Sequence, residues 1–227
     1  MSRRLKSTFL AVLLMFVCMN SHSQEFLLKA AGGFASHYDK DTKVVGSFFF
    51  GVGYDLPLGS SDWSFSPFLG FYAKGWKDSD VLVPVLDDNG NPVFDENGEE
   101  RKSLCNRTGA ANYLELPLLA NYHISFNEAN VLTLSVGPYV ALGISGKTKT
   151  KGDGEKPGSE KLYYSQNTFD LQGTKRFDMG MQAGIAYSFN EQFSLGVESD
   201  FGLSKFGIGN RRNISGLVSI TYRFVSN

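Results

Sequence analysis

The segment from Asn213 to Phe224, NISGLVSITYRF, alternates along its whole length between two kinds of residue. One face carries Ile214, Gly216, Val218, Ile220, Tyr222 and Phe224. The other face carries Ser215, Leu217, Ser219, Thr221 and Arg223. This period of two predicts a β-strand that is apolar on one side and mostly polar on the other. Such a strand, with an aromatic residue near its end, is typical of the closing strand of a membrane β-barrel, which turns its apolar face to lipid.

The first residues are typical of an export signal. Three basic residues precede a short apolar run, Phe9–Met19, which is too short to span a bilayer as a helix. Ser21 and Ser23 supply the small residues of a cleavage site, so we expect a signal peptide over residues 1–23. Cys18 leaves a lipid anchor open as the less favoured alternative.

The mature chain, residues 24–227, is expected to form one domain. The leader removes three of 22 cations and no acid, so 19 cations face 23 acids and the net charge is −4. This balance argues against a nucleic-acid-binding protein. Cys105 is the single cysteine of the mature chain, so no intramolecular disulfide can form there.

Eight strands with turn signals between them are predicted, and no amphipathic helix interrupts them. The predicted strands are Glu25–Tyr38, Lys43–Leu56, Trp63–Lys77, Ala111–Phe126, Val131–Lys147, Arg176–Phe189, Gln192–Phe206 and Asn213–Phe224. Two connections are long, at residues 78–109 and 148–175, and the second is Lys- and Gly-rich, so we expect it to be mobile. Short turns on one side and longer loops on the other are typical of an outer-membrane barrel.

The aromatic residues distinguish a membrane barrel from a soluble sandwich or lipocalin-like barrel. They gather near both ends of the predicted strands, as two belts at the two interfaces of a bilayer would. The lower belt is predicted from Tyr54, Trp63, Tyr122, Phe193 and Phe224, and the upper belt from Tyr38, Trp76, Tyr113, Phe177 and Phe206. The sequence therefore predicts an all-β, eight-stranded, antiparallel up-and-down transmembrane barrel in the outer membrane.

The polar faces of the strands carry charges that the barrel would enclose. An eight-stranded barrel is just wide enough for side chains to fill it, and enclosed charges need partners. We favour a network that closes the lumen over a proton or ion path. The predicted lumen charge network is Lys29, Lys74, Glu115, Asp178, Glu198, Asp200 and Arg223.

Two weaker patterns point to chemistry. His123 and Ser125 share an inward face, as in a hydrolytic His-x-Ser pair, but no acid can be assigned to orient the imidazole. Asp87, Asn89 and Asn91 resemble the start of a calcium loop whose later positions fail, so we expect a hairpin turn there instead. We expect no catalytic residue, no metal site and no cofactor.

Pro117 and Pro138 lie within predicted strands, where proline cannot donate to the ladder. Counting from the turn between these strands places the two prolines nearly opposite each other. They predict a bulge or a locally widened pair, and a weak seam that admits a partner is the functional alternative.

The strand YLELPLLANY (Tyr113–Tyr122) resembles the signature strand of the PorT-like outer-membrane β-barrel family of Bacteroidetes, with Asn121 in place of the usual basic residue. The segments Gly137–Lys147 and Arg176–Phe189 resemble the next two strands of that family. The resemblance implies a small barrel. Through a founding member of the PorT-like family, it also implies a link to type IX secretion. Barrel assembly machinery reads a terminal aromatic residue in such proteins, and here three residues follow Phe224.

Three classes of function remain open from the sequence. The favoured one is a closed barrel with a structural or interaction role through its outer loops. The alternatives are a narrow pore or transporter and, less favoured, a lipid A-modifying enzyme. The expected partners are outer-membrane lipid and lipopolysaccharide, the barrel assembly machinery, and a surface or secretion partner that contacts loops 78–109 and 148–175; we expect no nucleic acid.

Overall fold

The computed structural model describes residues 25–38, 42–127, 130–207 and 211–224. It contains eleven strands and one short 3-10 helix, η1. They are β1 (Glu25–His37), β2 (Thr42–Lys43), β3 (Val45–Pro57), β4 (Trp63–Pro84), β5 (Lys102–Ser125), β6 (Val131–Ser145), β7 (Lys147–Asp153), β8 (Lys161–Asn167), η1 (Thr168–Asp170), β9 (Phe177–Ser188), β10 (Phe193–Gly202) and β11 (Asn213–Phe224).

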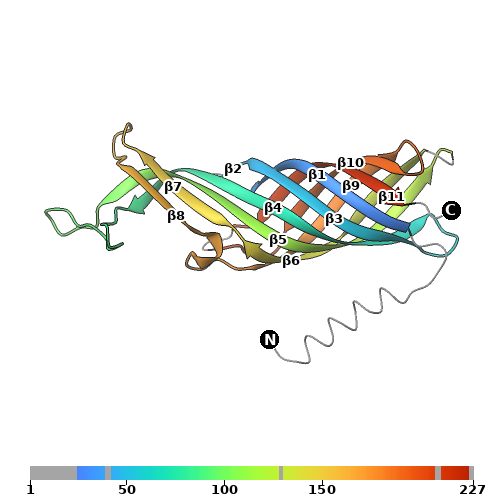
Figure 1. The fold of residues 1–227 in the computed structure, drawn as a ribbon, viewed down its shortest axis with the longest axis horizontal. Coiled ribbons are helices and arrows are strands. Elements are labelled where there is room, and N and C mark those ends of the chain that lie inside the picture. Colours follow the sequence, from blue (N-terminus) through green and yellow to red (C-terminus); the bar gives the residue numbers. More distant parts are fainter. Residues whose placement is uncertain (1–24, 39–41, 128–129, 208–210, 225–227) are drawn as a thin grey trace, which may run out of the picture.

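Eight of these strands close into a ring in which every neighbour is antiparallel (Figure 1). The order around the ring is β1, β3, β4, β5, β6, β9, β10 and β11, and β11 pairs back onto β1. The predicted eight-stranded up-and-down barrel is confirmed. The terminal strand has the bounds that were predicted for it, because β11 spans Asn213–Phe224.

The wall of the barrel has the two faces that the alternation predicts. In β11, Val218 is 61% exposed on the outside, whereas its neighbour Ser219 is 6% exposed toward the lumen. At the lower end, aromatic rings contact one another around the outside. These contacts are Phe26 with Tyr54 and Phe224, Trp63 with Tyr122, and Tyr222 with Phe193 and Phe224.

The predicted upper belt is wrong for three of its members. Trp76, Tyr113 and Phe206 are buried, with at most 6% of each side chain exposed. On β4 and β5, alternation aims Trp76 and Tyr113 at the lumen, on the same faces as the buried Lys74 and Glu115. An aromatic residue near a strand end therefore belongs to a belt only when the alternation of its strand places it on the outer face.

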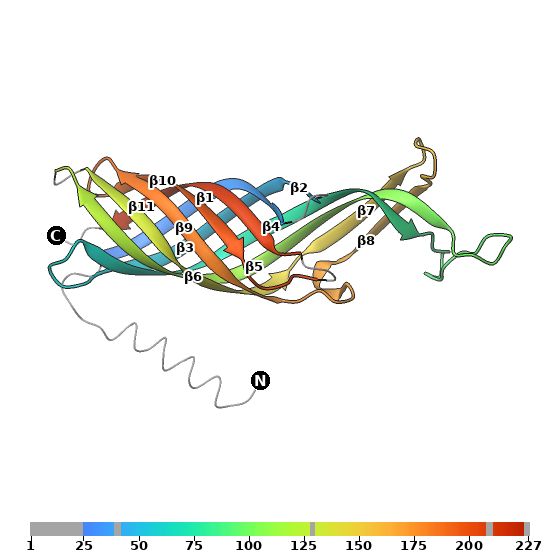
Figure 2. The same cartoon turned by 180° about the vertical axis from the view of Figure 1, so that it is seen from behind.

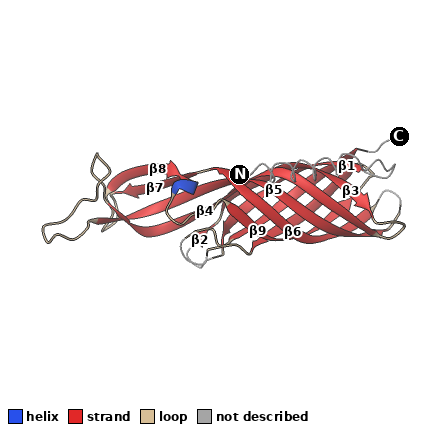
Figure 3. Ribbon diagram, turned by 90° about the horizontal axis from the view of Figure 1, so that it is seen from below, coloured by secondary structure: helices blue, strands red, loops and turns tan. Residues whose placement is uncertain are grey.

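The two long connections are not loose loops. β4 runs on to Pro84 and β5 begins at Lys102, so this hairpin extends well beyond the predicted strand ends. The segment that we expected to be mobile forms the hairpin β7–β8, and β7 pairs with β5. Figures 1, 2 and 3 show the four strands rising together from one end of the barrel. We call this four-stranded projection the extension; it stabilises what composition alone would make a flexible segment.

Beyond the extension, residues 85–100 form two successive eight-residue repeats, VLDDNGNP and VFDENGEE, which our sequence reasoning missed. In the first, the Asp87 carboxylate accepts hydrogen bonds from the backbone amides of Asn89 and Asn91, and in the second Asp95 does the same. The amide of Asn91 is the main reason why the pKa of Asp87 lies below its usual value. The expected turn at this position is confirmed, and Gly90 takes the positive φ of 83° that the turn requires.

Of the bulge or locally widened pair predicted at Pro117 and Pro138, the bulge is wrong. Pairing of β5 with β6 lapses between Pro117↔Tyr139 and Ala120↔Val136, yet the register is the same on both sides. A side chain on Gly137 would meet the Leu118 carbonyl oxygen at 1.9 Å, so the two strands approach closely at this point. The ladder is therefore interrupted without an inserted residue.

The predicted signal peptide and its cleavage before Gln24 lie outside the described residues and stay predictions. Among the residues that the structure describes, no helix is long and apolar enough to cross a membrane.

Candidate functional site: the barrel lumen

Lys74 on β4 occupies the half of the lumen nearer the extension. Its Nζ lies 2.7 Å from Glu115 Oε2, 3.2 Å from Asp200 Oδ2 and 3.7 Å from Asp178 Oδ2. None of the four side chains is more than 4% exposed. One ammonium among three carboxylates is short of positive charge, so the carboxylates need further hydrogen-bond donors.

Neutral side chains supply such donors to two of the three carboxylates. Asp178 accepts hydrogen bonds from Asn213 Nδ2 at 2.8 Å and from Ser204 Oγ at 2.6 Å. Asp200 accepts one from Gln182 Nε2 at 2.8 Å. These contacts join β9, β10 and β11 to the charges of β4 and β5, so the network ties opposite walls of the barrel together.

Tyrosine rings enclose the same ammonium. Lys74 Nζ lies 4.4 Å from the ring centroid of Tyr72, 4.3 Å from that of Tyr139 and 5.7 Å from that of Tyr113. A cation above an aromatic face is favourable when water is excluded. We call Lys74, its three carboxylates and these three rings the lysine cluster.

An aromatic layer lies between the lysine cluster and the extension. The His37 ring stacks on Trp76 with centroids 4.4 Å apart, and Phe206 lies 4.8 Å from each of these two rings. Phe169 of η1 packs against Phe206 from above. The half of the lumen nearer the extension is thus filled, first by charge and then by rings.

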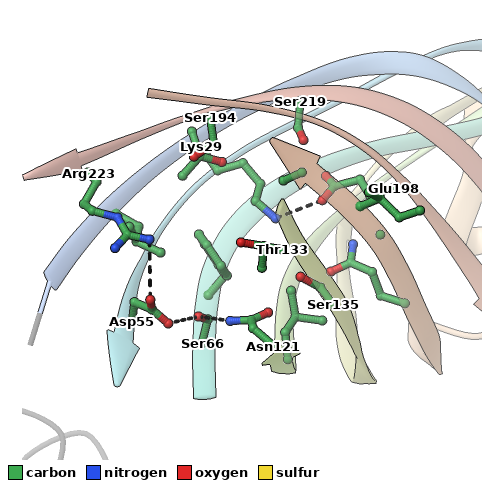
Figure 4. Close-up of a pocket in the computed structure, with 18 of the residues that line it drawn as sticks. Lys29, Asp55, Ser66, Asn121, Thr133, Ser135, Ser194, Glu198, Ser219 and Arg223 are labelled. Atoms are coloured by element: carbon green, nitrogen blue, oxygen red, sulfur yellow. Dashed lines mark hydrogen bonds and ion pairs between the residues drawn. The ribbon is translucent and has the colours of Figure 1, made fainter. Parts of the chain in front are cut away.

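The half of the lumen farther from the extension contains two smaller ion-pair groups. Lys29 donates to Glu198 at 2.8 Å, and its Nζ lies 4.3 Å from the Phe68 ring centroid. Arg223 pairs with Glu25, and its Nη2 lies 3.5 Å from Asp55 Oδ2. Figure 4 shows Lys29 with Glu198, and Arg223 with Asp55, as two separate pairs on the inner wall.

Cavities remain between those groups. One of about 80 Å³ lies against Lys29, Glu198 and Asn121, and another of about 360 Å³ lies lower, against Glu25 and His123. Arg223 and Asp55 border both of them. This half of the lumen is therefore a polar, partly empty space.

All seven residues of the predicted lumen network face the lumen, but the structure divides them. Lys74, Glu115, Asp178 and Asp200 come together, Lys29 pairs with Glu198, and Arg223 contacts none of the predicted acids. Its partners Glu25 and Asp55 were missed. The alternation of β3, which turns Asp55 inward with Ser47 and Phe49, could have identified one of them.

His123 faces the lumen as predicted, but its environment differs from expectation. Ser64, not Ser125, is hydrogen-bonded to His123 Nε2, at 2.8 Å. An acid is present after all, because Asp55 Oδ2 lies 3.9 Å away, yet it approaches the same ring nitrogen as Ser64. Nδ1 bonds Thr133 instead. A catalytic triad needs base and acid contacts on opposite ring nitrogens, which this arrangement does not provide.

No group of three metal-ligating side chains forms a metal site within the described residues. The Asp87 carboxylate, the start of the calcium-like pattern, accepts hydrogen bonds from its own turn.

The comparison with protein families decides what this barrel is. The family model described as outer membrane protein beta-barrel domain matches residues 5–206. The chain belongs to this family. Its place is the outer membrane. Barrels of this membrane have their short turns on the periplasmic side and their longer connections outside the cell, and by this rule the extension is extracellular.

Solved outer-membrane barrels are similar to this family member at low identity. A major outer membrane protein from Thermus thermophilus is 14% identical, with 89% of this chain and 100% of that chain covered and a TM-score of 0.45. The attachment invasion locus protein Ail of Yersinia pestis is 14% identical, with 88% and 97% covered and a TM-score of 0.42. Neisserial surface protein A is 11% identical, with the same coverage and a TM-score of 0.39. No curated protein is significantly similar in sequence.

Proposed function

We propose that this protein is a closed outer-membrane barrel whose working part is the extension, with the barrel as its anchor. The observation that carries the proposal is the filled extracellular half of the lumen. Lys74 and Glu115 are at most 1% exposed there, beneath the ring layer of His37, Trp76 and Phe206. A solute that entered from the periplasm would stop at this level.

The extension has the features of an interaction surface. It is built of paired strands, so its shape is fixed, and it carries large apolar side chains in water. Leu82 is 65% exposed and Tyr163 60%, and Phe94, in the turns beyond the strands, is 59% exposed. The tip is crossed by ion pairs, Arg101 with Glu160 and Lys156 with Asp80, and the second of these raises the pKa of Lys156 above its usual value. A rigid surface with apolar anchors and a charged rim is typical of protein recognition.

The finer assignment within this proposal is a PorT-like protein of Bacteroidetes, with a secretion partner bound by the extension. The Tyr113–Tyr122 strand supports that assignment through its resemblance to the signature strand of that family. A non-enzymatic role is part of the proposal, and the arrangement of Ser64, His123 and Asp55 supports it.

Planar-bilayer recording tests the closed barrel. The folded mature chain should show no stable single-channel steps, whereas Lys74→Ala combined with Trp76→Ala, which empties the sealed half, should show them. Stable steps from the unaltered protein would instead favour the narrow pore, for which the periplasmic cavity is the supporting feature.

Site-specific photo-crosslinking in cells tests the interaction role. A crosslinker at Leu82 or Tyr163 should capture a distinct partner, and the matched position is Leu195, an exposed residue on the lipid face of β10. Equal capture from Leu195 would contradict recognition by the extension.

A further inference from the structure

The foot of the extension carries a stripe of lysines on its outer face. In β7, Lys147, Lys149 and Lys151 are exposed, whereas the alternate residues Thr148 and Thr150 are buried. β7 follows β6 after the single residue Gly146. A side chain on Gly146 would meet the Ala110 carbonyl oxygen at 2.2 Å, so glycine is needed where β6 leads into β7.

This stripe continues the lipid-facing surface of the barrel. The last outward side chains of β6 are Leu142, 53% exposed, and Ile144, 48% exposed. Lys147 follows three residues later, about 10 Å farther along the strand. The apolar surface therefore gives way to ammonium groups at the level where a bilayer gives way to its headgroups.

Neighbouring strands add lysines to the same level. Lys43 on β2 lies directly opposite Lys77 on β4. Lys77 lies opposite Thr108 on β5, and Thr108 lies opposite Lys149 on β7. We call Lys43, Lys77, Lys147, Lys149 and Lys151 the basic band.

No carboxylate of the described residues forms an ion pair with the basic band. Like charges directly opposite each other on paired strands are destabilising, as Lys43 and Lys77 are here. The cations at the tip do have acidic partners: Lys156 pairs with Asp80, and Arg101 with Glu160. An anion from outside the protein would relieve the repulsion within the band.

We propose that the basic band binds the phosphate groups of the outer-leaflet glycolipid of the outer membrane. Its position next to the lipid face and its uncompensated positive charge select this occupant over a soluble one. Bound glycolipid would hold the foot of the extension against the membrane surface, and so would fix the direction in which the interaction surface points. This inference rests on the outer-membrane location and not on the identity of any protein partner.

The test compares binding of labelled lipid A to variants of the mature chain folded in neutral detergent micelles. The altered protein carries Lys147→Gln, Lys149→Gln and Lys151→Gln. The matched control carries Lys102→Gln, Lys156→Gln and Lys161→Gln, which removes the same charge near the tip. Fluorescence anisotropy measures affinity, and heat-dependent mobility on a denaturing gel verifies folding. If the first variant does not fold, Lys43→Gln with Lys77→Gln tests the same surface.

Each basic residue near an anionic lipid surface contributes about a factor of five, so the first variant should bind bisphosphorylated lipid A roughly 100-fold more weakly. The control should change affinity little, and dephosphorylated lipid A should bind weakly to all three proteins. Equal losses in both variants, or equal binding of dephosphorylated lipid A, would overturn the proposal. Competition by millimolar inorganic phosphate as strong as that by unlabelled lipid A would also overturn it, because it would identify a soluble anion as the occupant.

Discussion

The two halves of the lumen are built from the same eight strands, but they bury their charged side chains to different extents. In the extracellular half, Lys74 and its three carboxylates are almost fully buried, and rings and amide side chains pack against them. In the periplasmic half, Arg223 and Glu25 are about three-tenths exposed, and cavities separate the ion pairs. The first half is a core made of polar groups, and the second is a vestibule.

This difference follows from the cost of removing charge from water. A buried ion pair is favourable only when its geometry is good and its remaining lone pairs are bonded. The extracellular half meets the first condition through Lys74, but Glu115 Oε1 accepts no hydrogen bond from the described residues. In the periplasmic half water can reach the charges, so their geometry is less constrained. The filled half lies next to the extension, and the cavities lie toward the opposite end of the barrel.

The largest effect should come from removing the ammonium of the sealed half. Lys74→Met leaves Glu115, Asp178 and Asp200 without their cation in a place that water does not reach. We expect a loss of about 3–5 kcal/mol in the free energy of unfolding. Urea unfolding of the folded barrel, followed by tryptophan fluorescence, measures it.

Lys29→Met is the matched change in the periplasmic half. Its partner Glu198 lines the cavity and can be hydrated there, so the loss should be about 1–2 kcal/mol. Equal losses for the two variants would mean that the halves do not differ in solvent access.

The loss of stability caused by a charge on the outer face should not depend on which half of the lumen lies behind it. Val218→Arg, on the lipid side of β11, should destabilise the barrel by about 2–4 kcal/mol, because arginine is costly near the bilayer midplane. Ser219→Arg points to the lumen and should act through different neighbours. Spin labels at the two positions check the faces: relaxation by a lipid-soluble agent at 219 and not at 218 would refute the register.

The sequence predicted the wall of the barrel better than its contents. Alternation determines which side of a strand each residue faces, so the terminal strand and the inward direction of Lys74, Glu198 and Arg223 could be predicted. Which inward residues meet depends on the stagger between strands, which alternation does not encode. Arg223 therefore pairs with Glu25 and Asp55, acids that the sequence did not connect to it.

The extension shows where composition misled. Lys147–Asp153 reads as polar and flexible, yet its threonines pack inward and it pairs with the extended part of β5. Pairing with a partner strand outweighs weak local propensity. The eight-residue repeat at 85–100 can be read from the sequence itself, but the resemblance of its first half to a calcium loop led to another interpretation.

The smallest effect concerns three prolines in the wall around the cavity. Pro67 on β4, Pro117 on β5 and Pro138 on β6 each coincide with a lapse in pairing toward the preceding strand of the barrel. The prolines are linked step by step, since Pro67 pairs with Leu118 and the position opposite Leu118 on β6 is Pro138. By contrast, Pro138 pairs normally with Met181 on β9. The interruptions therefore form one line across β3 to β6, which we call the proline seam.

The proline seam should exchange amide hydrogens faster than the rest of the wall. Each proline removes one ladder donor, and a hydrogen bond of about 1 kcal/mol corresponds to about fivefold to tenfold in local protection. Residues that flank Pro117 and Pro138 should therefore exchange faster than residues at matching depth in β9 and β10, whose ladder is continuous.

Pro138→Val restores a donor without changing the outward direction of the side chain, and it should slow exchange on both sides of position 138. Because Leu118 already lies against Gly137, we expect a local loosening and not an open gap. Equal protection in all four strands would mean that the prolines are tolerated, and that the two halves of the barrel differ in their lumen alone and not in their wall.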